Sequence, residues 1–283
     1  MTAAAEVSTC LVCGSGRSRG ALGGVLRQCS DCTFSWTAAE IPPPEELYDD
    51  AYFSGAGYED YFVPSARRYE AGLRVQWLLS GGTPATLVEA GCAAGFFIEA
   101  AQGEGIAAQG VEVCEAAVQF ARDDLGVKVT HGCFESAVFG TAFDAVCAFH
   151  VLEHVEDPKD FLDAAWRALE PGGRLALEVP NVFSPAARRL GTSWRGLQPE
   201  YHRWHFTPAS LARLVTDRGF EIAEQDTAVF RFYMPPRYRR RAGRSEFPAD
   251  VRNVRSARLT HPYRGDLLRL IARRPAAGGR TVS

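Results

Sequence analysis

The chain of 283 residues lacks any long apolar run and has very little lysine. No stretch approaches the roughly 20 apolar residues that cross a bilayer, so we expect no membrane span. The first ten residues, MTAAAEVSTC, show no basic segment before an apolar core, which argues against a secretory signal and favours a cytoplasmic protein. The only lysines are Lys128 and Lys159, a bias typical of GC-rich bacterial genes.

The small net charge of −3 hides an uneven distribution, because arginine is concentrated near the end of the chain. Acidic residues in the segment from 231 to 283 are limited to Glu246, Asp250 and Asp266. Residues 235–265 are interpreted as an Arg-rich insertion before a last strand. It is either a solvated loop or a clamp for an anionic phosphate or carboxylate. RNA contact is a third reading, disfavoured because few aromatics are available for base stacking.

The eight cysteines fall into two groups. Scattered cysteines in apolar segments indicate buried small side chains: Cys92, Cys114, Cys133 and Cys147. Paired cysteines form two C-x2-C knuckles, with a hairpin expected between them: Cys10, Cys13, Cys29 and Cys32. In a cytosolic chain this spacing predicts a structural Zn2+ site, since four thiolates leave no open coordination position. The alternative is four free or disulfide-paired cysteines.

Three regions follow from the pattern along the chain: a zinc-ribbon-like segment over 1–40, a proline-marked connector with a helix over 41–80, and a large domain over 81–283. The helix is expected within 58–80. In the large domain, expected strands over 85–90, 107–113, 127–132, 143–151, 174–181 and 220–226 alternate with expected helices over 95–105, 115–126, 157–171 and 207–220. Residues 266–275 are expected to form a last strand paired with 220–225. Such alternation predicts a doubly wound, mostly parallel sheet covered on both faces.

The turn in LVEAGCAAGFF, residues 87–97, joins a strand to a helix, where such sheets bind nucleotides. A dinucleotide fingerprint needs three glycines, yet Ala93 and Phe96 occupy the second and third positions, which argues against NAD and FAD. Glu112, at the end of the next strand, is placed to accept ribose hydroxyls. Glu89 suits a ligand with a positive amino group. Adenosine, an amino acid and a positive charge together describe S-adenosylmethionine.

Five segments resemble the class I S-adenosylmethionine-dependent methyltransferases over about residues 58–230: LVEAGCAAGFF, GVEVCEAAVQFAR, FDAVCAFHVLEHVEDP, ALEPGGRLALEVPN and HRWHFTPASLARLVTDRGF. The resemblance implies a Rossmann-like sheet of seven strands. The cysteine-bearing start is similar to a bacterial subgroup with an N-terminal zinc segment, several of them in natural-product pathways such as antibiotic biosynthesis.

By that resemblance, the turn holds the methionine part of the cofactor, Glu112 its ribose, and residues near Cys133 its adenine. The full implied set is Glu89, Gly91, Cys92, Ala93, Gly95, Phe96, Phe97, Glu112, Val113, Cys133, Phe134, Glu135, Phe149, His150 and Val151. Many relatives carry an aspartate near 133 that binds the adenine amino group. Here that contact is left to backbone groups or to Glu135.

Histidine suits a general base near neutral pH, and His150, His202 and neighbouring Tyr201 are the candidate catalytic residues. The alternative, non-catalytic role of His150 is packing against the cofactor. The alternative role of Tyr201 and His202 is to brace a loop. Glu153 and His154 are expected to be structural. The alternative for that pair is a divalent ion, as in some quinone methyltransferases with a similar segment.

The leading hypothesis is methyl transfer to oxygen or nitrogen of a small, natural-product acceptor, with anionic acceptors favoured if the Arg-rich segment is a clamp. A zinc-containing RNA methyltransferase and a non-catalytic protein that keeps the cofactor fold are the alternatives. Whether the protein is a monomer or a homodimer is left open.

Overall fold

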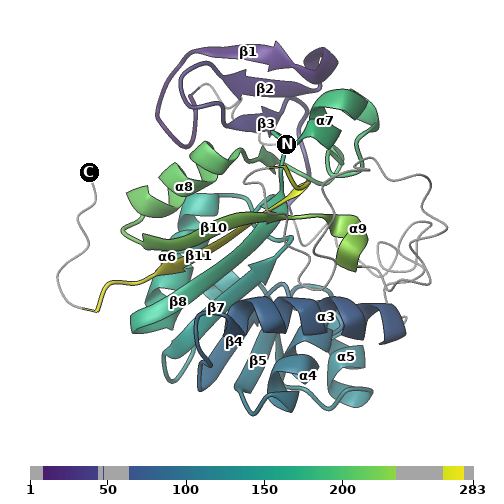
Figure 1. Ribbon diagram of the computed structural model, residues 1–283, viewed down its shortest axis with the longest axis vertical. Coiled ribbons are helices and arrows are strands. Elements are labelled where there is room, and N and C mark those ends of the chain that lie inside the picture. The colour runs from purple at the N-terminus through teal and green to yellow at the C-terminus, as the bar shows by residue number, and fades with distance from the viewer. Residues whose placement is uncertain (1–8, 44–46, 48–63, 234–263, 277–283) are drawn as a thin grey trace.

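The computed structural model describes residues 9–43, 47, 64–233 and 264–276, and in these parts the chain forms one large and one small sheet (Figure 1). The Arg-rich segment predicted over 235–265 lies outside the described residues except at its last two positions. Within the described ranges, none of the helices has the length and apolar character that crossing a bilayer would require.

The large sheet has seven strands in the order β10-β11-β8-β7-β4-β5-β6. Their bounds are β4 Thr86–Ala90, β5 Ala107–Glu112, β6 Val129–His131, β7 Phe143–Phe149, β8 Leu169–Pro180, β10 Glu221–Ala228 and β11 Leu267–Arg273. The five strands from β8 to β6 are parallel, whereas β11 runs antiparallel to both of its neighbours. The doubly wound sheet and the pairing of the last strand with the strand at 221 are therefore confirmed.

Helices cover both faces of this sheet: α3 Pro64–Leu79, α4 Phe96–Gly103 and α5 Glu115–Asp123 on one, α6 Pro158–Ala168 and α8 Pro208–Asp217 on the other (Figure 1). Alternate residues of β4 enter different cores, since Leu87 packs with α3 and α4 while Val88 packs with α6 and α8. Thr207 caps α8 as predicted, through a capping box with Ser210. Short helices α7 Pro185–Leu190 and α9 Phe230–Tyr233 were not predicted.

The helix predicted over 157–171 is shorter than expected. It ends at Ala168, and β8 begins at Leu169. Pro171 disfavours helical backbone at Glu170, and Gly172 adopts φ +86°. The pairing of β7 with β8 shifts register at the same place, after Phe143.

The small sheet has the order β1-β2-β3-β9, with β1 Ser18–Ala21, β2 Leu26–Cys29, β3 Ser35–Thr37 and β9 Trp204–His205. The hairpin predicted between the two cysteine knuckles is present as β1 and β2. β9 comes from the large domain, so the N-terminal segment and that domain share one sheet. Phe34 completes the junction, because its ring lies 5.8 Å from that of Trp204 and 5.5 Å from that of Phe206.

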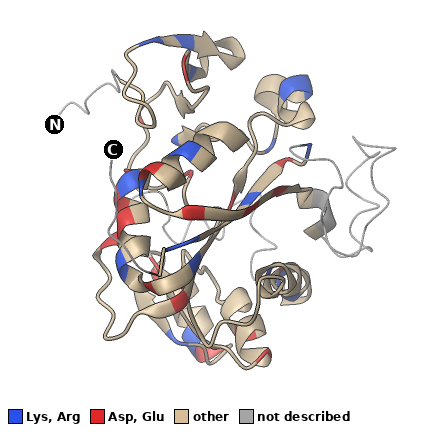
Figure 2. Cartoon of the chain, turned by 60° about the vertical axis from the view of Figure 1, so that its left-hand side comes forward, with Lys and Arg blue, Asp and Glu red and all other residues tan. Residues whose placement is uncertain are grey.

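Basic and acidic residues are interspersed along the described helices and strands (Figure 2). Among the charged side chains, several are buried rather than solvated, including Glu89, Glu178 and Arg269. Buried charges need partners, and those partners lead to the site.

Candidate functional site

The turn after β4 is held in a conformation that only small residues permit. Gly91 has φ +62°, and a Cβ on it would lie 2.5 Å from Val151 Cγ2. Gly95 has φ +81° and precedes α4 as its N-cap. Ala93 adopts φ +48°, which is strained for a residue with a Cβ. The turn therefore brings its backbone close to the loop that follows β7.

Glu112, at the end of β5, holds this turn in place through hydrogen bonds. Its Oε2 accepts a hydrogen bond from the Ala93 amide at 2.8 Å, and Oε1 accepts from the amides of Val113 and Cys114, each at 2.9 Å. Burial raises the pKa of Glu112, and the three amide donors oppose that rise. Oε1 accepts two of these bonds and Oε2 only one, so Oε2 has a lone pair left to accept a hydroxyl donor.

Glu89, at the same end of β4, is only 4% exposed. Burial raises its pKa to about 8, despite the opposing charge of Arg74. Its Oε2 is buried and has no hydrogen-bond partner among the described residues. An unpartnered buried carboxylate oxygen at the mouth of the turn suits a cationic ligand group, which would favour the ionised form.

Helix α3 supplies charged residues that the sequence analysis did not single out. Arg67, Glu70 and Arg74 line one pocket, which the turn and Phe149 complete on its other side. Cys92, Phe96 and Phe97, which were predicted to bind the cofactor, also line it. The only sign of these residues in the sequence was the helical spacing of three charged side chains, and such spacing is equally typical of a solvent-exposed helix face.

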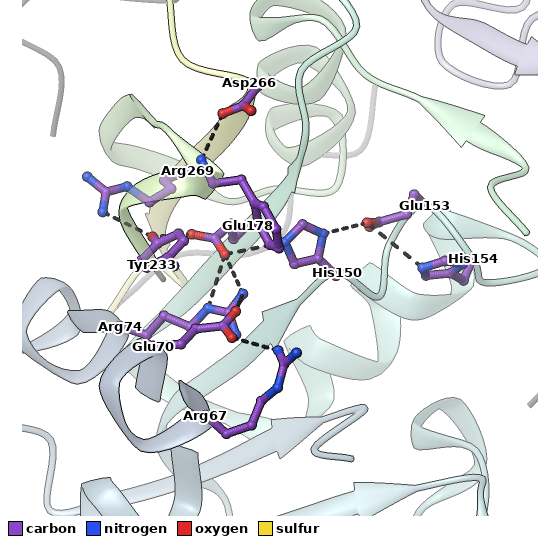
Figure 3. Close-up of polar contacts among 11 residues, drawn as sticks. Arg67, Glu70, Arg74, His150, Glu153, His154, Glu178, Tyr233, Asp266 and Arg269 are labelled. Atoms are coloured by element: carbon purple, nitrogen blue, oxygen red, sulfur yellow. Dashed lines mark hydrogen bonds and ion pairs between the residues drawn. The ribbon is translucent and has the colours of Figure 1, made fainter. Parts of the chain in front are cut away.

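A chain of polar contacts runs from α3 to the end of β7 (Figure 3). Arg74 lies 2.9 Å from Glu70 Oε1 and 2.7 Å from Oε1 of Glu178, a fully buried residue of β8. Tyr233 donates to the other oxygen of Glu178 at 2.5 Å. Burial opposes ionisation of Glu178, but Arg74 and further neighbours lower its pKa, so Glu178 is a carboxylate.

His150 lies between two carboxylates (Figure 3). Its Nδ1 is 3.1 Å from Glu153 Oε1, and its Nε2 is 3.6 Å from Glu178 Oε1, too far for a hydrogen bond. Nε2 is buried and has no hydrogen-bond partner in the described part of the chain. Burial disfavours the charged ring, but Glu153 and Glu178 outweigh it and raise the pKa of His150. The residue also adopts φ +57°, a strained backbone of the kind that concentrates at functional sites.

The other predicted catalytic residues lie beyond Glu153 rather than over the turn. His202 is 4% exposed, and its ring centroid is 4.6 Å from that of His154. Its Nδ1 is 3.2 Å from Gly196 O, and burial lowers its pKa well below the usual value, so the ring is neutral. The carbonyl of Tyr201 lies 3.1 Å from Nδ1 of His154.

Glu153, His154 and His202 also form a cluster whose candidate ligand atoms all lie within 4.8 Å of one another. Glu153 Oε2 is buried with no partner among the residues described, so the cluster has the donor atoms to hold a divalent ion. Glu153 is bonded to His150, and the structural role predicted for Glu153 and His154 stays a prediction.

Residues implied for adenine contact follow β6, two strands away from β4. Phe134 turns into the core, where its ring lies 5.3 Å from that of Phe161. Cys133 and Glu135 flank it in a short 3-10 turn. Val113 and Val151 border the turn through their contacts with Glu112 and Gly91.

The four N-terminal cysteines converge as predicted. Cys10 and Cys32 have their sulfurs 3.4 Å apart, those of Cys13 and Cys29 are 3.5 Å apart, and all four lie within 4.8 Å of one another. A tetrahedron with Zn–S bonds of about 2.3 Å places its sulfurs about 3.8 Å apart, so these thiols fit Zn2+. None of the four is in a disulfide.

Comparison with known proteins decides the family, because the model of a methyltransferase domain family matches residues 65–225. This chain belongs to that family. It is a class I, S-adenosylmethionine-dependent methyltransferase, and its sheet has the seven strands that the resemblance implied. The residues at the turn fit the cofactor, because Glu89 offers a buried carboxylate oxygen that has no hydrogen-bond partner among the described residues and suits a cationic amino group.

Two curated relatives are ubiquinone biosynthesis O-methyltransferases. The one from Thiobacillus denitrificans is 28% identical over 54% of this chain and 72% of its own length. The mitochondrial one from Schizosaccharomyces pombe is 30% identical over 33% of this chain, and the match spans only 37% of that relative.

Solved structures share the fold. A possible histamine N-methyltransferase from Thermotoga maritima is 23% identical, with a TM-score of 0.56 over 77% of this chain and 94% of its own. Magnesium protoporphyrin IX methyltransferase from Synechocystis, with bound S-adenosylhomocysteine, is 17% identical, with a TM-score of 0.53 over 81% of this chain and 97% of its own.

Proposed function

We propose that this methyltransferase transfers a methyl group to oxygen or nitrogen of a small-molecule acceptor and that His150 is its general base. The observation that carries the proposal is the setting of His150. It is strained, its Nδ1 is tied to Glu153, and its Nε2 is left without a partner among the described residues. The curated O-methyltransferase relatives favour oxygen as the acceptor atom. A natural-product acceptor remains the proposal made from the sequence.

Cofactor binding is assigned to the turn and the acids beside it. Glu89 would hold the amino group, and Glu112 would accept a ribose hydroxyl through the lone pair left on Oε2. Arg67 and Arg74 add positive charge to the same pocket and suit the cofactor carboxylate. Cys133, Phe134 and Glu135 are proposed for the adenine side through backbone groups, since the Phe134 ring is committed to the core.

The cofactor supplies an electrophilic methyl, so the protein mainly has to align the acceptor and remove its proton. Hydrogen bonding of Nδ1–H to Glu153 would leave the Nε2 lone pair of neutral His150 to take that proton. The carboxylates of Glu153 and Glu178 then stabilise the imidazolium that forms. Tyr201 and His202 are assigned to the acceptor side, where the buried His202 shapes the wall rather than acting as a base.

The test uses S-adenosylmethionine with a labelled methyl group and two fractions of a bacterial extract, one of small metabolites and one of RNA. Label in the metabolite fraction supports the proposal, and label in RNA alone supports the RNA alternative. Cofactor binding without transfer to either fraction would favour a non-catalytic protein.

In the same assay, His150→Gln should lower turnover by about a hundredfold, the typical contribution of a general base. Binding of S-adenosylhomocysteine, measured by calorimetry, should stay within about twofold of the wild type because Gln keeps the polar contact to Glu153. Unchanged turnover in His150→Gln would remove His150 from the mechanism.

A further inference from the structure

The chain from Gln198 to Thr207 passes between the loop after β7 and the four-cysteine segment. On its inner side it is bonded to the loop after β7. The amides of Arg203 and Trp204 donate to the Glu153 carbonyl at 2.9 and 3.2 Å, and Trp204 Nε1 donates to the Val155 carbonyl at 2.8 Å. This inner side therefore lies next to the residue that holds His150.

On its outer side the same stretch is bonded to the four-cysteine segment through Thr37, at the end of β3. The Thr37 amide donates to the Arg203 carbonyl at 2.9 Å. Its hydroxyl donates to the His202 carbonyl at 2.5 Å and lies 3.0 Å from His205 Nε2. Thr33 adds a contact at 3.1 Å with the hydroxyl of Thr207, the cap of α8.

The Thr37 hydroxyl fixes the protonation of His205. A hydroxyl has one proton, and here that proton is directed to the His202 carbonyl. Nε2 of His205 must then carry a hydrogen and donate it to Thr37 Oγ1. All three residues are buried, so loss of the hydroxyl would leave His205 Nε2 without this partner.

Metal binding and this stretch are linked through Phe34. Phe34 lies two residues after Cys32, is fully buried, and packs against the rings of Trp204 and Phe206. Cys10 and Cys29 belong to the same continuous core as Phe34 and Trp204. Ordering of the knuckles by a metal would therefore order the packing surface under β9.

We propose that the four-cysteine segment is a brace that positions residues 201–205, with Thr37 as its main positioning residue. The metal would then act on the acceptor side of the site while leaving the cofactor turn unaffected. Figure 3 supports this separation, because Glu153 and His154 lie on the side of His150 away from Glu178 and Arg74. The link to the acceptor rests on the proposed function, whereas the link between metal and histidines does not.

The first experiment compares Thr37→Val, Thr37→Ser and a control, Thr216→Val, in the metal-loaded full chain. Thr216 is exposed, and among the described residues its hydroxyl is bonded only within α8. Thr37→Val should speed amide hydrogen exchange over 201–206 by about tenfold and release the fixed Nε2–H tautomer of His205, seen in nitrogen-15 histidine spectra. Thr37→Ser should restore both readouts, and Thr216→Val should change neither.

The second experiment removes the metal with a chelator or with Cys32→Ser. Exchange over 201–206 should rise while the Kd for S-adenosylhomocysteine stays within about twofold, which also shows that the large domain is folded. Unchanged exchange and tautomer in Thr37→Val, or loss of S-adenosylhomocysteine binding together with the metal, would overturn the brace. Failure of the intact, metal-loaded protein to bind S-adenosylhomocysteine would instead count against the proposed function.

Discussion

Cofactor affinity should depend on pH through Glu89. Its pKa of about 8 means that the free protein holds a neutral carboxyl at pH 7, whereas the bound amino group calls for a carboxylate. Only about a tenth of the molecules are ionised at pH 7 and about a hundredth at pH 6. Affinity for S-adenosylhomocysteine should therefore rise about tenfold between pH 6 and pH 7, and binding should release a proton.

The charged groups around Glu89 determine how strongly cofactor affinity depends on pH. Arg74 favours the carboxylate, while Glu112 and Glu70 oppose it. Glu112 also has a raised pKa and contributes in the same direction. Calorimetry across this pH range, in two buffers with different ionisation heats, measures both the Kd and the proton released.

Glu89→Gln separates the contribution of Glu89 from those of its neighbours. The variant should bind more weakly near pH 8 but lose most of the pH dependence. Glu99→Gln, a change at a half-buried residue of α4 that pairs with Arg68, should keep the pH dependence. Stability adds an independent check. A carboxyl with a raised folded pKa stabilises the fold fully below pH 4.5 and loses that contribution as pH rises through about 8. A flat wild-type profile, or an equal slope in Glu89→Gln, would refute the reasoning.

Three further changes test the frame of the site. Gly91→Ala should weaken S-adenosylhomocysteine binding at least tenfold by calorimetry, because its Cβ would meet Val151 at 2.5 Å. Glu178→Gln should lower the free energy of unfolding in urea by about 3 kcal/mol, because it removes one of the two carboxylates paired with buried Arg74, whereas exposed Glu170→Gln should change it little. Purified protein should contain one Zn2+ per chain by metal analysis, lost in Cys32→Ser but kept in Cys133→Ser; no bound metal in the wild type would exclude the zinc site.

Local patterns were enough to predict the large sheet. Buried strands alternating with amphipathic helices leave few arrangements, and the capping residues Thr207 and Asp157 mark two helix starts in the sequence. The cysteine pairs predicted their own convergence for the same reason, since the hairpin between them is local. The turn at 91 could be predicted because positions with a positive φ are usually glycine, and these glycines are visible in the sequence.

Long-range contacts are not visible in this way. Arg74 and Glu178 are 104 residues apart in the sequence, and nothing in either segment indicates that they form a buried ion pair. A strand of two residues, β9, has no period to detect, so its union with the N-terminal segment was not predicted. Tyr201 and His202 were predicted as catalytic residues, but they directly precede β9, which pairs with β3 of the small sheet.

The position of β11 has a consequence for synthesis on the ribosome. This strand lies between β8 and β10, although it follows both in the chain. β10 can therefore join the sheet only after residues 267–273 have left the exit tunnel, and until then the edge of β8 is open to pairing with other chains. Nascent chains halted before residue 267 should expose that edge and recruit chaperones, even though every residue of the cofactor turn has already been made.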